Sequence, residues 1–200
     1  MAKKKYYLDS DKREMLEVKW TPGWKQTYVL FNNEQLAVVS KEDVSIGTTV
    51  GLSGNRTLEL KLDKGLFTTL VTKINGEHIP GSMGDPSYQL RQIFYLLLFL
   101  GAVNIAVGLV FYFGDFKVDA LPGIGLMNTV LGVVQIALGF AISKGSMMAL
   151  VAATVLMVAD LGMTIVYAAG AMMPVIMKAF FVVFIVRGFR FVKEYKIKNI

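Results

Sequence analysis

The amino-acid sequence predicts an α+β membrane protein in which a small antiparallel β-sandwich or barrel precedes a four-helix transmembrane bundle. Residues 1–89 mix polar and apolar side chains, whereas residues 92–192 are almost free of charge. The first part contains short segments of alternating polarity, which are typical of strands, and the second contains four long apolar stretches. We therefore divide the chain into an all-β domain (1–85), a linker (86–91), a helical bundle (92–192) and a basic tail (193–200).

Strand-like segments fill the region between Met15 and Ile79. They are short, rich in valine, leucine, threonine and aromatic residues, and several alternate between apolar and polar positions. The Asn75-Gly76 pair favours a tight hairpin turn, because both central residues of such a turn take positive φ. The runs 40–43 and 61–64 carry alternating charges and are interpreted as a solvated sheet face. We expect about six strands, five of them at 17–20, 26–31, 34–39, 57–62 and 67–74.

Four apolar stretches are long enough to cross a bilayer, whose hydrocarbon core needs about 20 helical residues. They cover residues 92–113, 122–142, 147–168 and 172–192. Residues that commonly begin or end helices lie at their boundaries, namely Gly114, Pro122, Ser146, Gly170 and Pro174. Because the links are short, neighbouring spans are expected to run antiparallel.

Basic residues near the ends of the spans predict the orientation of the chain. Arg91, Lys144 and the cations of the tail lie on one side, and Lys117 lies on the other side between two aspartates. Both termini are therefore expected in the cytoplasm, and the chain is expected to be an integral protein of a bacterial inner membrane or plasma membrane. The tail cations are expected to contact anionic lipids of the cytoplasmic leaflet: Arg187, Arg190, Lys193, Lys196 and Lys198.

Two opposite charges interrupt the third and fourth apolar stretches. Asp160 lies nine residues before the centre of the turn near Ala169, and Lys178 lies nine residues after it. At a helical rise of about 1.5 Å per residue, both side chains lie roughly 13 Å from the turn and thus at the same depth. A lone charge at that depth costs about 3 kcal/mol on insertion scales. The two side chains are therefore predicted to pair inside the bundle.

Glycine and amide side chains mark one face of the first two spans. Both contain Gly-x-x-Asn-x-x-x-Gly, and this spacing places the three residues on one helix face. The helix-packing glycines are Gly101, Gly108, Gly125, Gly132 and Gly139, and the intramembrane polar layer is Asp160, Lys178, Asn104, Asn128 and Gln135. This layer either fixes the packing of the helices or binds and passes an ion, a proton or a small polar solute. The glycine stripe could equally form an interface between protomers.

The composition excludes several classes of function. The chain has no cysteine and one histidine, His78, so cysteine chemistry and histidine-rich metal sites are absent from the sequence. The segment 51–55 resembles a phosphate-binding loop but lacks its lysine. Residues 1–89 carry twelve basic and eleven acidic side chains, a net charge of +1, whereas residues 187–200 carry five basic and one acidic side chain, a net charge of +4. Most of the net charge of +6 therefore lies at the C-terminal end and indicates no nucleic-acid partner. No catalytic, cofactor or metal site is expected.

The remaining hypothesis is a non-enzymatic membrane anchor, scaffold or sensor. Its cytosolic β-domain would recruit or respond to a cytosolic protein partner, and the chain is expected to form a homo-oligomer through its glycine-rich faces. The alternative is a small oligomeric channel or transporter subunit that uses the intramembrane polar layer.

Overall fold

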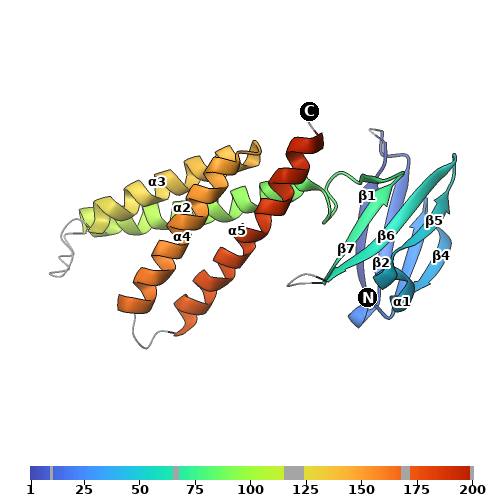
Figure 1. Ribbon diagram of the computed structural model, residues 1–200, viewed down its shortest axis with the longest axis horizontal. Helices are drawn as coiled ribbons and strands as arrows, with labels where there is room; N and C mark the ends of the chain where they lie inside the picture. The colour runs from blue at the N-terminus through green and yellow to red at the C-terminus, as the bar shows by residue number, and fades with distance from the viewer. Residues whose placement is uncertain (10, 65–67, 115–123, 168–171, 199–200) are drawn as a thin grey trace. The chain divides into compact units, whose positions relative to one another are not determined.

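The computed structural model describes residues 1–9, 11–64, 68–114, 124–167 and 172–198, which divide into two compact units (Figure 1). Residues 1–88 form a β-rich unit, and residues 89–200 form a helical unit. Among the described helices, three are long and apolar enough to cross a membrane, and they are the helices that contain the first three predicted spans. This part of the predicted fold class is confirmed.

Two four-stranded antiparallel sheets make up the β-rich unit. Sheet A has the strand order β1-β2-β3-β4, and sheet B has the order β5-β6-β7-β8. Sheet A contains β1 (Ala2–Tyr7), β2 (Met15–Trp20), β3 (Gln26–Phe31) and β4 (Glu34–Ser40), with a short 3₁₀ turn η1 (Pro22–Trp24) before β3. Sheet B contains β5 (Thr48–Leu52), β6 (Arg56–Lys64), β7 (Thr68–Ile74) and β8 (Glu77–His78).

One apolar core is shared by the two sheets, so the unit is a sandwich. Leu16, Val18 and Val29 from sheet A are fully buried in the same cluster as Leu58 and Leu60 from sheet B. In β3 and β6 the buried residues alternate with less buried ones, as the polarity pattern predicts, whereas in β2 Glu17 between Leu16 and Val18 is buried as well. The described residues form eight strands rather than the six or so expected. The sequence did not predict β1, β5 and β8, because these strands are short or rich in polar residues and their alternation is weak.

The predicted turns are partly right. Asn75 and Gly76 both take positive φ, at 50° and 82°, and join β7 to β8 as the tight hairpin requires. The run 40–43, however, is not a sheet face. Ser40 is the N-cap of helix α1 (Lys41–Ile46), and its hydroxyl accepts a hydrogen bond from the backbone N–H of Asp43 at 3.2 Å. A serine followed three residues later by an acidic residue is a helix-start signal.

The segment after β8 is a set of tight turns and leads directly into a helix. Helix α2 (Pro86–Phe113) includes residues 86–91, which the sequence predicts as a linker. The Asp85 carboxylate accepts hydrogen bonds from the backbone N–H groups of Gly81 and Ser87, at 2.8 and 3.0 Å. The side chain therefore caps the start of α2 and holds the preceding turn at the same time.

The helical unit contains α2, α3 (Ile124–Ser143), α4 (Met147–Tyr167) and α5 (Met172–Lys198). Their bounds match the predicted spans closely, apart from the longer N-terminal end of α2 and C-terminal end of α5. Ser146 caps α4 as predicted, because its hydroxyl accepts a hydrogen bond from the backbone N–H of Ala149 at 3.3 Å. Pro122 and Gly170 lie outside the described residues, so their predicted roles at helix ends cannot be compared.

Glycines bring the backbones of α2 and α3 into contact. A Cβ atom added to Gly101 would lie 2.6 Å from the carbonyl oxygen of Gly132, and one added to Gly132 would lie 2.5 Å from that of Gly101. Gly108 and Gly125 oppose each other in the same way two helical turns further along. Gly139 packs on Leu97 and Phe94 of α2. The glycine faces are therefore occupied within one chain.

The buried core of the helical unit lies at one end of the helices. It contains residues from the start of α2 and α4 and from the end of α3 and α5, including Leu97, Ile142, Leu150 and Ile185. Beyond this core the α2–α3 pair and the α4–α5 pair diverge (Figure 1). Only 22–28% of each membrane-length apolar window is buried, so most side chains of these helices face outward.

Replacing Gly132 by alanine is expected to destabilise the helical unit, because the new methyl group meets the backbone of α2. Overpacking of this kind typically costs roughly 1–3 kcal/mol. Gly162→Ala is the matched control, since a Cβ at Gly162 has no atom within 4 Å. Unfolding in mixed detergent micelles, followed by circular dichroism, should show a loss for Gly132→Ala alone. Equal stability of the two variants would contradict the observed backbone contact.

Candidate functional site

An ion pair joins α4 and α5 within their apolar segments. The Lys178 ammonium lies 2.8 Å from Oδ1 of Asp160 and donates a second hydrogen bond, of 2.7 Å, to the Thr164 hydroxyl. Thr164 is one turn beyond Asp160 on the same face of α4. The two charged side chains are about equally exposed, at 29% for Asp160 and 30% for Lys178. The contact is the one that their equal distances from the turn predict.

A second polar contact joins α2, α3 and α4. The side-chain amide of Asn104 donates a 2.8 Å hydrogen bond to Oε1 of Gln135, and the Gln135 Nε2 donates to the sulfur of Met157 at 3.8 Å. Gln135 is 1% exposed, so both ends of its side chain are held away from solvent. A buried amide of this kind needs partners, because an unpaired polar group in an apolar setting is costly.

The predicted polar layer is therefore two separate clusters, which we name the amide cluster (Asn104, Gln135, Met157) and the charge cluster (Asp160, Thr164, Lys178). Helix α4 contributes to both, through Met157 and Asp160, which are one turn apart. Asn128 is half-buried, and the described part of the chain records no hydrogen bond of its side chain. The structure thus brings four of the five predicted polar residues into two pairs and leaves Asn128 outside them.

The predicted lipid-contacting cations lie in the C-terminal part of α5. Arg187 and Arg190 lie near the end of the apolar stretch, and the lysines lie in the tail that follows it. The Arg187 guanidinium lies 5.7 Å from the centre of the Phe191 ring, and Arg190 forms an ion pair of 2.9 Å with Glu194. Lys193 and Lys196 are exposed, whereas the side chain of Lys198 lies outside the described residues. Part of the predicted lipid-contacting set is therefore engaged within α5 itself.

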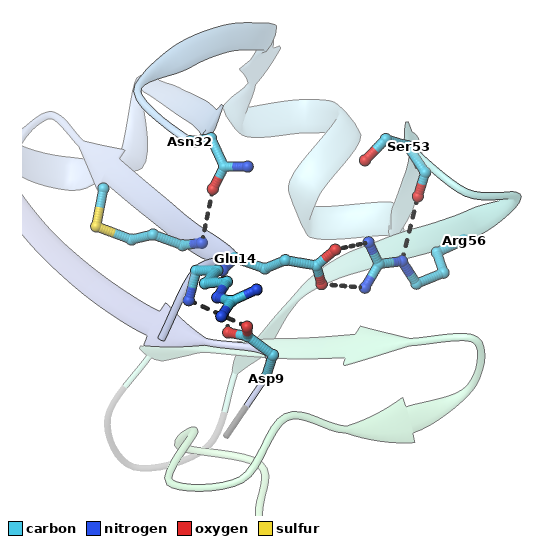
Figure 2. A network of polar contacts seen from close by, with 7 residues as sticks. Asp9, Glu14, Asn32, Ser53 and Arg56 are labelled. Atoms are coloured by element: carbon cyan, nitrogen blue, oxygen red, sulfur yellow. Dashed lines mark hydrogen bonds and ion pairs between the residues drawn. The ribbon is translucent and has the colours of Figure 1, made fainter. Parts of the chain in front are cut away.

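A polar network that the sequence analysis did not find connects the two sheets of the sandwich (Figure 2). Arg56, at the start of β6, donates hydrogen bonds of 2.6 and 2.9 Å to the two carboxylate oxygens of Glu14, which precedes β2. It also donates to the Ser53 carbonyl at 3.2 Å. Asp9 accepts from the backbone N–H groups of Arg13 and Glu14, both at 3.0 Å. The network ties the β1–β2 loop to the β5–β6 hairpin.

Hydrogen bonds in this network shift the pKa values of Asp9, Glu14 and Arg56. The hydrogen bonds from Arg56 lower the pKa of Glu14, and the same contact raises the pKa of Arg56. The backbone N–H of Glu14 is the main cause of the lowered pKa of Asp9. Both carboxylates are therefore held in their ionised form. No local signal identifies the pair, since Glu14 and Arg56 are 42 residues apart in the sequence.

The described residues offer little for metal chemistry. Within them, no group of three or more histidine, aspartate or glutamate side chains is placed to hold a metal ion. His78 ends β8, and its ring is packed against Gly84, where an added Cβ would lie 2.5 Å from Nδ1. The chemistry that the amide cluster and the charge cluster can supply is amide hydrogen bonding and charge pairing.

Removing one member of the charge cluster is expected to destabilise the helical unit more than replacing both. Asp160→Ala or Lys178→Ala leaves one intramembrane charge alone, which costs up to about 3 kcal/mol. The double change Asp160→Leu with Lys178→Met removes both charges and should recover part of this loss. The exposed pair Arg190–Glu194 is the matched control and should show a coupling of about 0.5 kcal/mol or less. Unfolding in mixed micelles measures all variants, and additive losses at 160 and 178 would contradict the pairing.

Acid is expected to weaken the sandwich through Glu14. Because its pKa is lower in the folded chain, the ion pair stabilises the fold above the unfolded carboxyl pKa of about 4.3, and this contribution is lost as the pH falls through the folded value. Glu14→Gln should therefore lower the Tm at neutral pH, and its difference from the wild type should close in acid. The fluorescence of Trp20 and Trp24, the chain's two tryptophans, which stack at 4.8 Å in the sandwich, reports the transition. Glu34 is exposed, so Glu34→Gln is the control. A difference in Tm between Glu14→Gln and the wild type that persists in acid would exclude a stabilising role of the Glu14 carboxylate.

Comparison of the chain with models of protein families, with curated proteins and with solved structures gave no significant match. A function has therefore to be inferred from the chain's own contacts, burial and charge.

Proposed function

We propose that the chain is a non-enzymatic, multi-pass membrane anchor that presents a folded β-sandwich to the cytoplasm. In this role the sandwich recruits or responds to a cytosolic protein, and the helices hold it at the membrane. The apolar character of three helices and the compactness of the β-rich unit support the proposal. A separate folded unit next to membrane-length helices is the arrangement that an anchor, scaffold or sensor requires.

The proposal includes α5 as a fourth crossing, which makes the helical unit a four-helix bundle. Lys178 and the tail cations reduce the apolar character of α5, but Asp160 neutralises Lys178 at a distance of 2.8 Å. Ile185, Phe191 and Val192 of α5 share the buried core of the other three helices. With four crossings, both termini and the α3–α4 turn at Lys144 lie on the cytoplasmic side, in agreement with the distribution of basic residues.

One observation carries the choice of an anchor over a transport protein: the intramembrane polar side chains bind one another across helices. Gln135 uses both ends of its amide within the chain and is 1% exposed. Contacts of this kind contribute about 0.6–2 kcal/mol each to helix association. The amide cluster is thus accounted for by helix packing, without a bound solute.

Self-association of the anchor requires a surface other than the glycine faces. Gly101, Gly108, Gly125 and Gly132 pack between α2 and α3 of one chain and leave no room for a second protomer there. The outward-facing apolar side chains of the helices are available to lipid or to another copy. A homo-oligomer therefore stays part of the proposal, but its interface has to lie elsewhere.

A channel or transporter subunit is the second candidate, and the charge cluster favours it. Asp160 and Lys178 remain about 30% exposed, and the described contacts use only one of the two carboxylate oxygens of Asp160. Reconstitution into liposomes separates the two functions. A proton or ion flux that Asp160→Asn abolishes would replace the anchor by this candidate, whereas an absence of flux at equal incorporation supports the anchor.

Labelling of single cysteines in intact cells tests the four-crossing anchor, because the natural chain contains no cysteine. Phe116→Cys, between α2 and α3, is expected to react with a membrane-impermeant maleimide from outside. Lys144→Cys, at the α3–α4 turn, and Lys196→Cys, near the end of α5, should react only after the cells are opened. Labelling of position 196 but not of position 144 from outside would instead indicate three crossings, and would remove the basis for a shared cytoplasmic side.

A further inference from the structure

We infer that the outer face of sheet A is a docking surface for an anionic lipid bilayer. This inference rests on the proposed function, since it assumes a sandwich held next to a membrane, and it adds a second contact with the lipid surface. The outer face is the side of the sheet that points away from the shared apolar core. Its residues follow from the strand register, which places them in rows across all four strands.

One half of this face is basic. In the first row, Lys3 of β1 is paired with Lys19 of β2, and in the second row Lys5 of β1 is paired with Glu17 of β2. The Glu17 carboxylate is 3% exposed and lies 3.8 Å from the Lys3 ammonium and 3.4 Å from that of Lys19. One buried acid therefore lies beneath two of three lysines, and the cations above it form the surface that a ligand meets.

The other half of the face carries an apolar strip between polar residues, because Gln26 is paired with Ser40 on one side of it and Leu30 with Gln35 on the other. The same two rows continue into Tyr28 and Leu30 of β3, which are half-buried, and Val38 of β4 lies beside Tyr28. Val38 is 48% exposed, and the neighbouring Leu36, at the irregularity in β4, is 40% exposed. An apolar strip next to a row of lysines, all on one side of a sheet, is not explained by the folding of the sandwich.

The outer face of sheet B is an internal comparison. Its register pairs Glu59 with Lys73 and Lys61 with Val71, so charges of both signs alternate along the strands. This is an ordinary solvated face. The two sheets therefore differ in what they expose, although both contribute to the core, and the difference points to a partner for sheet A.

The chemistry of sheet A matches an anionic bilayer surface. Adsorption to such a surface combines burial of apolar side chains with attraction of cations to acidic headgroups. Each net positive charge near an anionic leaflet contributes about 1 kcal/mol, and the three lysines together with Glu17 leave a net charge of +2 beside the apolar strip. Tethering through α2 keeps the sandwich close to the membrane, so a weak attraction per residue is sufficient. An acidic protein segment could bind the same cations, but it would have to compete with the bilayer, next to which α2 holds the sandwich.

The experiment uses the full-length chain in vesicles of phosphatidylcholine, with or without phosphatidylserine, whose acyl chains carry bromine. An environment-sensitive fluorophore is attached to Val38→Cys, or to Thr49→Cys on the outer face of sheet B. We expect phosphatidylserine to increase quenching at position 38 and to leave position 49 unchanged. Lys5→Gln should lower the ratio of docked to free sandwich by about fivefold, the equivalent of ~1 kcal/mol for one cation. Lys61→Gln, the same loss of charge on sheet B, should have no effect.

Several outcomes would overturn the inference. They are equal quenching at positions 38 and 49, no response to phosphatidylserine, or equal effects of Lys5→Gln and Lys61→Gln. Protection of position 38 by a soluble acidic peptide, without quenching by the anionic vesicles, would assign the face to a protein partner instead. Lys5 is the chosen cation because Glu17 keeps its contacts with Lys3 and Lys19 in that variant. Both leaflets of the vesicles contain phosphatidylserine, so an inverted topology would fail the cysteine labelling but not this measurement.

Discussion

The pairing of polar side chains inside an apolar environment is the constraint on which the helical unit depends. Asp160 binds Lys178, and Gln135 binds Asn104, in segments whose other side chains are almost all apolar. Helix α4 takes part in both clusters because Met157 and Asp160 lie one turn apart. The rotation of α4 about its axis is therefore set by two neighbours at once, α3 on one side and α5 on the other. Glycine contacts then bring α2 close enough to α3 for Asn104 to reach Gln135.

Much of the helical unit could be predicted because depth in a membrane helix depends only on counting residues. Equal distances from one turn place Asp160 and Lys178 at one level, and the repeated Gly-x-x-Asn-x-x-x-Gly spacing places the glycines on one face. Counting residues does not determine which faces meet, since that depends on the rotation and crossing of each helix. For this reason the two asparagines, although equivalent in their motifs, have different surroundings. Asn104 reaches Gln135, whereas Asn128 stays outside both clusters. Residue spacing also does not say which helix a glycine face contacts. For this reason the sequence allowed an interface between protomers as well as the contact that α2 and α3 make within one chain.

The sandwich was predictable where alternation is strong and was missed where it is weak. Strand β6 alternates buried leucines with polar residues over its whole length and is recognisable from the sequence. Strand β1 contains three consecutive lysines, one of which, Lys4, points inward, is half-buried and places its ammonium over the rings of Tyr6 and Tyr88. Because an inward-facing position is occupied by a lysine, the sequence of β1 lacks the alternation of apolar and polar residues that identifies a strand. The Glu14–Arg56 pair is a different case, because it joins two turns that only the folded sandwich brings together. No spacing rule within a strand or hairpin contains that information.

Helix α5 shows how pairing changes the meaning of composition. Judged alone, it is not among the helices that are long and apolar enough to cross a membrane, although its length is 27 residues. The charges that set it apart are of two kinds. Arg187, Arg190 and the lysines beyond them lie at its C-terminal end, where a headgroup region can accept cations. Lys178 lies within the apolar segment, where the Asp160 carboxylate is 2.8 Å away. An apolar count treats α4 and α5 separately and assigns one charge to each helix, whereas in the proposed four-crossing arrangement the two charges would form a single neutral contact. The number of crossings therefore has to be judged on helix pairs when acid and base face each other at one depth, and the proposed fourth crossing rests on that standard.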